Sequence, residues 1–168
     1  MKAPPLLPEE TLRRVLRVAR LDGMSVLVIA GLFALISALA GDGLGAVVGL
    51  LVAGAGAVEL HGAKYLEHGA ARGMNWLVTS QLLLLATIIG YCGLRLLHPA
   101  VEPLRAAVTD DMKTQLEAAG WTQDAFIRFI YNTTYVAVAI VTFFYQGGMA
   151  LYYLRRREPV AQALGPEL

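Results

Sequence analysis

Three polar side chains that could do chemistry fall at similar depths within long apolar segments of the chain. If the second apolar segment enters a bilayer at residue 44, Glu59 lies about 22 Å along a helix and about 8 Å short of the inner edge. The same arithmetic puts Gln81 about 8 Å and Gln146 about 9 Å inside that edge. An ionisable group at such depth is costly unless it is partnered or hydrated, so it is a functional candidate. The sequence therefore predicts an intramembrane polar layer of Glu59, Gln81 and Gln146.

This polar layer has several interpretations. The glutamine amides can donate hydrogen bonds to the Glu59 carboxylate, and Tyr145 or Ser80 can join them. In an oligomer the layer could line a path for ions. It could equally fix the register of the helices, or Glu59 could reach water at the inner interface. The sequence leaves these interpretations open.

Histidines near the end of the second apolar segment suggest a metal or haem site, but helical geometry argues against one. Glu59 and His61 point about 160° apart on one helix, so they cannot bind the same ion. His61 and His68 share a face but lie about 10 Å apart. A pairing of His61 with His98 or with a second subunit stays open. We predict a cytoplasmic cationic stripe that is solvated and attracts anions or senses pH: His61, Lys64, His68 and Arg72.

Other chemistry has little support in the chain. Cys92 is the single cysteine, so no internal disulfide can form. No nucleophile with a base, no pair of acids and no set of metal ligands can be assembled at the spacings that catalysis needs. We expect no catalytic residues, no cofactor and no metal, and no enzymatic activity.

Four long apolar segments must position these side chains. They span residues 24–41, 44–63, 76–97 and 125–154, and each is close to the roughly 20 residues that cross a hydrocarbon core. In the whole chain 57% of the residues are hydrophobic and only 16% are charged, whereas about a quarter of the residues of a soluble domain are charged. These features predict an all-α integral membrane four-helix bundle, with residues 1–168 as a single membrane domain.

The distribution of basic residues predicts the orientation. Ten of the 14 Lys and Arg residues fall in the N-terminal flank, the second connection and the C-terminal flank, which four spans put on one side. The positive-inside rule then places both termini in the cytoplasm, and we expect a bacterial inner membrane. With a net charge of +1 and the basic residues at membrane flanks, the lipid bilayer is the expected partner and nucleic acid is not.

The flanking segments carry their own patterns. Residues 8–22 predict an amphipathic interfacial helix that Asp22 and Gly23 end. Residues 98–122 predict an outer loop with a short helix that begins at Asp110, and residues 158–168 predict a disordered tail. Alternatively, the first apolar segment is a cleaved signal peptide ending at Ala40, which would leave three spans in the same orientation.

Small residues at a spacing of four mark the second apolar segment: Gly45, Gly49, Ala53 and Ala57. Such a row lets two helix backbones approach closely inside a membrane. It serves either to pack this segment against the first one within the chain or to form a homo-oligomer.

Two functions follow from these patterns. We expect a non-enzymatic assembly or interaction subunit, forming a homo-oligomer or joining a larger membrane complex. The alternative is an oligomeric channel or transporter that uses Glu59, Gln81 and Gln146.

Overall fold

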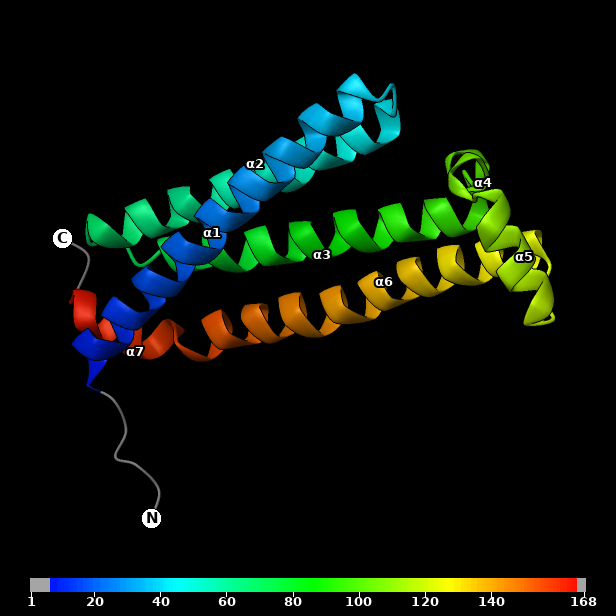
Figure 1. Ribbon diagram of the computed structural model, residues 1–168. Coiled ribbons are helices and arrows are strands. Elements are labelled where there is room, and N and C mark those ends of the chain that lie inside the picture. The colour runs from blue at the N-terminus through cyan, green and yellow to red at the C-terminus, as the bar shows by residue number, and fades with distance from the viewer. Residues whose placement is uncertain (1–6, 166–168) are drawn as a thin grey trace, which may run out of the picture. The chain divides into compact units, whose positions relative to one another are not determined.

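The computed structural model describes residues 7–165, and this part of the chain contains helices and no strands (Figure 1). The all-α class expected from the sequence is therefore confirmed. The helices are α1 (Pro8–Leu39), α2 (Gly43–Glu67), α3 (Gly73–Leu97), α4 (Glu102–Ala107), α5 (Asp110–Ala118), α6 (Gln123–Arg155) and α7 (Arg157–Leu164).

Four of these helices, α1, α2, α3 and α6, are long and apolar enough to cross a membrane. Their 32, 25, 25 and 33 residues correspond to about 38 to 50 Å of helix, which exceeds a hydrocarbon core of about 30 Å. Each is longer than its apolar segment, because the helix also includes residues that flank the segment in the sequence.

The chain divides into two compact units, which are described separately. The first unit comprises Met1–Ile88 and Phe144–Leu168, and the second unit comprises Ile89–Phe143. Both α3 and α6 contribute one part to each unit.

The first half of α1 is not the separate interfacial helix that the sequence predicted. A single helix runs from Pro8 to Leu39 and continues through Asp22 and Gly23. At Gly23 the backbones of α1 and α2 approach closely, since a β-carbon there would lie only 3.1 Å from the carbonyl oxygen of Gly56 in α2. The two helices cross so closely at this point that packing outweighs the low helix propensity of glycine, about 1 kcal/mol below alanine.

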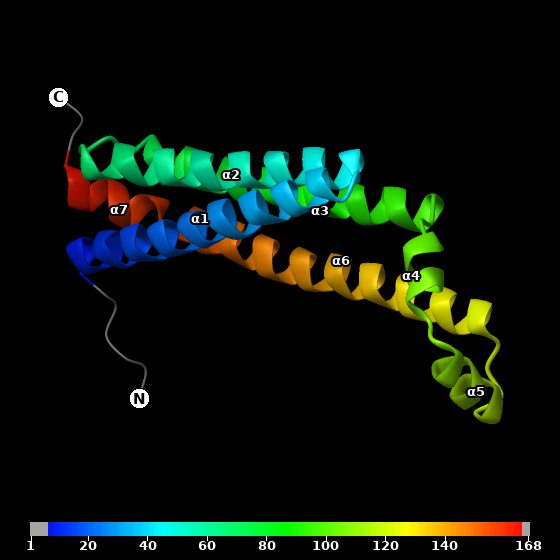
Figure 2. The ribbon, with the colours of Figure 1, turned by 45° about the horizontal axis from the view of Figure 1, so that its top comes forward.

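The helices α1 and α2 form an antiparallel hairpin whose backbones touch along a row of small residues (Figures 1 and 2). A β-carbon on Gly49 would lie 2.8 to 2.9 Å from Ala34 of α1. Gly41 turns the chain with φ of 75°, and Asp42 accepts a hydrogen bond from the Gly45 amide at 3.1 Å to begin α2.

The row of small residues follows the helix and not a strict spacing of four. Gly45, Gly49 and Ala53 are buried, but Gly56 continues the row and Ala57 is exposed. Each step of four residues turns a helix about 40° beyond one full circle, so a row must take a step of three to stay on one face. Ala57 therefore does not take part in the packing of α2 against α1.

The C-terminal segment is helical where the sequence predicted disorder. Val160 of α7 is fully buried and joins a core with Val15 and Ala19 of α1. The helix α7 lies beside the start of α1 (Figure 2). Composition alone did not reveal this contact, because the apolar partner surface comes from the far end of the chain. The rest of the predicted tail, residues 166–168, lies outside the described residues.

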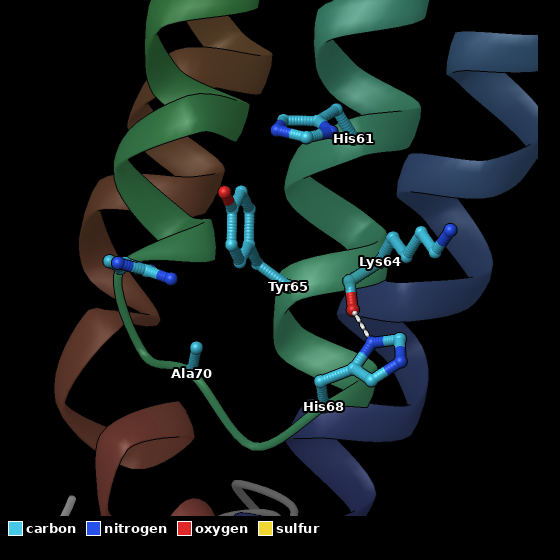
Figure 3. Close-up of a pocket in the computed structure, with 6 residues that line it drawn as sticks. His61, Lys64, Tyr65, His68 and Ala70 are labelled. Carbon is cyan, nitrogen blue, oxygen red and sulfur yellow. Dashed lines mark hydrogen bonds between the residues drawn. The ribbon is translucent and has the colours of Figure 1, made fainter.

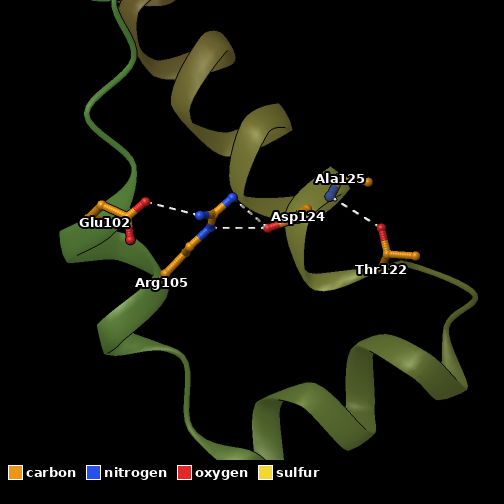
Figure 4. Close-up of polar contacts among 5 residues, drawn as sticks. All are labelled: Glu102, Arg105, Thr122, Asp124 and Ala125. Atoms are coloured by element: carbon orange, nitrogen blue, oxygen red, sulfur yellow. Dashed lines mark hydrogen bonds and ion pairs between the residues drawn. The ribbon is translucent and has the colours of Figure 1, made fainter.

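The second unit holds the connection between α3 and α6. Arg105 of α4 donates to Glu102 at 3.0 Å and to Asp124 at 3.1 Å, and thereby ties α4 to the start of α6 (Figure 4). Thr122 accepts a hydrogen bond from the Ala125 amide at 3.3 Å, which caps α6. The short helix predicted to begin at Asp110 is present as α5.

Candidate functional site: a buried carboxyl cluster

The three residues of the predicted polar layer are all buried in the first unit. Glu59 of α2 and Gln81 of α3 are 0% exposed, and Gln146 of α6 is 7% exposed. A fourth polar residue, Asp22 of α1, is 9% exposed. Each of the four long helices therefore contributes one buried carboxyl or amide group.

Two hydrogen bonds hold the Asp22 carboxyl group. The Gln81 side-chain nitrogen donates to Oδ2 at 3.1 Å, and the Tyr145 hydroxyl donates to Oδ1 at 2.8 Å. These donors come from α3 and α6, so Asp22 links α1 to both helices. The carboxyl group is accordingly a fixed part of the interior.

The Glu59 carboxyl group sits beside Asp22. The Tyr153 hydroxyl of α6 donates to Glu59 Oε1 at 2.6 Å. Asp22 and Gln81 are also close neighbours of the Glu59 carboxyl. Two carboxyl groups, one amide and two phenol hydroxyls thus form one group, here named the carboxyl cluster: Asp22, Glu59, Gln81, Tyr145 and Tyr153.

Hydrogen-bond acceptors outnumber donors in this region. Glu59 Oε2 and Gln81 Oε1 are buried and have no hydrogen-bond partner, and the same holds for Gln146 Oε1. A buried acceptor without a donor costs about 1–3 kcal/mol. The carboxyl cluster therefore has places for additional hydrogen atoms or for a cation.

Within residues 7–165, no basic group offsets the two acids. Among the described residues, the hydrogen bonds of Asp22 and Glu59 come from glutamine and tyrosine, and none comes from Lys, Arg or His. No group of three or more His, Cys, Asp or Glu side chains that could hold a metal ion occurs within residues 7–165. The arrangement suits a proton better than a divalent metal, which usually takes more ligands.

Sequence reasoning missed Asp22 and Tyr153 as members of the cluster. Asp22 was interpreted as a helix stop, yet it continues the buried face of α1 formed by Val15 and Ala19, at spacings of four and three. Tyr153 was assigned to an aromatic belt, yet it follows Gln146 by seven residues and so lies on the same helical face. These periodicities were the available signal.

The other predicted residues lie elsewhere. Ser80 donates to the Leu77 carbonyl at 2.8 Å, within its own helix. His61, Lys64, His68 and Arg72 line one pocket at the connection between α2 and α3. His98, which the sequence left as one possible partner of His61, belongs to the second unit.

The carboxyl cluster therefore brings two buried acids together, and such a pair can share a proton. No protein-family model, curated protein or solved structure matches this chain.

Proposed function

We propose that the protein is an integral membrane protein of the transport class that takes up and releases protons at Asp22 and Glu59. The observation that carries this proposal is the proximity of two buried carboxyl groups, which lie on different candidate membrane-spanning helices and have no basic partner among residues 7–165. Ionisable residues within membrane spans commonly mark proton relays and ion pathways.

One bound proton would resolve most of the local imbalance. A hydrogen on Glu59 Oε2 turns an acceptor that has no partner into a donor. Asp22 and Gln81 Oε1 are neighbouring acceptors that can receive it. Tyr145 and Tyr153 already donate to the two acids, so they stabilise whichever carboxyl group carries the negative charge.

An assembly or interaction subunit is the weaker proposal. It draws on the row of small residues in α2, as one possible oligomer interface, and on the lack of a catalytic set of residues in the sequence. Gly45, Gly49, Ala53 and Gly56 are buried within the chain, where they support close packing of α2 on α1. A homo-oligomer would therefore need a different surface.

Proton flux in liposomes tests the transport proposal. We expect the reconstituted protein to collapse a pH gradient, with a potassium potential clamped by an ionophore and an internal pH dye as the readout. Glu59→Gln and Asp22→Asn should reduce the flux to that of empty liposomes, because neither amide exchanges a proton. Glu9→Gln is the matched control, since Glu9 is an exposed acid of the same helix as Asp22.

Two results would overturn the proposal. The first is an absence of flux by the folded wild-type protein under every imposed gradient. The second is unchanged flux in both Glu59→Gln and Asp22→Asn. A flux that requires a sodium gradient and ignores the pH gradient would replace the proton by Na⁺ as the bound ion.

A further inference from the structure

A second site lies in the first unit at the connection between α2 and α3. A pocket of about 390 Å³ is lined by His61, Lys64, Tyr65, His68, Ala70 and Arg72 (Figure 3). This volume falls within the roughly 300–1,000 Å³ typical of small-ligand pockets. None of the lining residues belongs to the carboxyl cluster.

Aromatic rings hold two of the basic side chains of the pocket. The His61 ring meets the Tyr65 ring edge-on at 4.7 Å and the Trp76 ring at 5.6 Å. The Arg72 guanidinium lies over the Tyr65 ring, 4.5 Å from its centre. Tyr65 therefore positions both His61 and Arg72, and it limits the conformational freedom that they would lose on binding a ligand.

The two remaining basic residues, Lys64 and His68, are arranged differently. His68 uses Nδ1 in a hydrogen bond to the Lys64 carbonyl at 2.7 Å, and Lys64 extends its ammonium group toward α1 (Figure 3). The other ring nitrogen of His68, Nε2, takes no part in this hydrogen bond. Lys64 is a flexible side chain that adds positive charge nearby.

The charge of the pocket has one sign. Its lining contains lysine, arginine and two histidines but no acid. Glu67, the acidic residue in the last turn of α2, forms an ion pair with Arg20 of α1. That pairing neutralises the acid nearest in sequence to the pocket.

We propose that this pocket binds a phosphate group, with Arg72 and His61 as its principal ligands. The planar guanidinium forms paired hydrogen bonds with phosphate oxygens. The pocket lies where two membrane-spanning helices end, and basic pockets between such helices bind phospholipid headgroups. The phosphate belongs either to an anionic lipid headgroup or to a soluble phosphate compound, which present the same oxygens to the pocket.

The two sources are distinguished by paired measurements on the full chain in nanodiscs. In the first, nanodiscs contain phosphatidylcholine with a minor fraction of phosphatidylglycerol, and native mass spectrometry counts the phosphatidylglycerol molecules retained on release. In the second, nanodiscs contain phosphatidylcholine alone, and calorimetry follows a titration with inorganic phosphate. Retained lipid supports a headgroup, and calorimetric binding without retained lipid supports a soluble phosphate.

The variants tie the binding to the pocket. Arg72→Gln should weaken whichever ligand binds by about tenfold or more, because it removes a charged hydrogen bond. Arg72→Lys keeps the charge but loses the planar fork, so it should bind between the wild type and Arg72→Gln. His61→Gln should also weaken binding, and it leaves the contact between Arg72 and Tyr65 in place.

The matched control is Arg14→Gln, which removes an exposed arginine from α1 of the same unit. It should retain binding. Absence of both lipid retention and phosphate binding in the wild type would overturn the proposal. So would an equal loss in Arg14→Gln and Arg72→Gln, which would reveal general surface charge. If Arg72→Gln does not fold, unchanged binding in both Arg72→Lys and His61→Gln would overturn it as well.

Discussion

Tyr153 shows how one hydroxyl group can stabilise a buried acid. Its side chain is 0% exposed, and the hydroxyl donates to Glu59 at 2.6 Å. The other oxygen of Glu59 has no hydrogen-bond partner, so the Tyr153 hydroxyl is the main hydrogen-bond donor to this carboxyl group. A carboxyl group without donors in a water-poor interior is costly.

We expect Tyr153→Phe to lower the free energy of unfolding by about 1–3 kcal/mol, since the ring stays and only the donor is lost. Thermal unfolding in detergent measures the change. Tyr152→Phe is the matched control, because Tyr152 is only half-buried and its ring contact with Arg156 persists in phenylalanine. Equal effects of the two substitutions would show that the bond to Glu59 contributes little.

At the scale of elements, the hairpin of α1 and α2 depends on glycines that face the partner helix. Gly49 and Gly56 leave no space for a β-carbon, whereas Gly54 of the same helix faces open space. Inside a membrane the hydrophobic effect does not drive helices together, so van der Waals contact between closely packed backbones stabilises the helix pair instead. The packing of the hairpin therefore depends on which face of α2 carries the glycines and not on how many glycines the helix contains.

Gly49→Ala should destabilise the protein by about 1–3 kcal/mol, because the added methyl group would press on the Ala34 backbone. Gly54→Ala should be neutral or slightly stabilising, since alanine favours a helix by about 1 kcal/mol. The midpoints of thermal unfolding of the two variants provide the comparison. A stable Gly49→Ala protein would show that the hairpin can separate without cost.

At the scale of the whole molecule, four helices that are long and apolar enough to cross a membrane set which segments share a side. In the first unit, the start of α1, the connection between α2 and α3, and α7 gather at one end (Figures 1 and 2). These segments, together with the residues that flank them in sequence, carry ten of the 14 Lys and Arg residues. Together with the positive-inside rule, this supports our proposal that both termini face the cytoplasm.

Cysteine labelling tests this orientation. Cys92 is the single native cysteine and is buried, so background labelling should be low. In intact cells, a membrane-impermeant maleimide should react with Thr114→Cys, which lies in the connection between α3 and α6. It should react with Gly165→Cys only after lysis. The reverse pattern would invert the orientation.

The sequence by itself determined the helical class, the four spans and most of their residues. These features depend on local hydrophobicity and on the length of helix that a bilayer requires. It also identified Glu59, Gln81 and Gln146, because a polar residue in an apolar segment stands out without knowledge of its neighbours.

Only the tertiary structure decided which of these residues meet and which helices continue. Asp22 and Gly23 have the propensities of a helix end, but contacts with Gln81, Tyr145 and Gly56 keep them helical and buried. The helix α7 likewise depends on a core that it shares with α1. Such contacts join residues up to 123 positions apart, so no local pattern contains them.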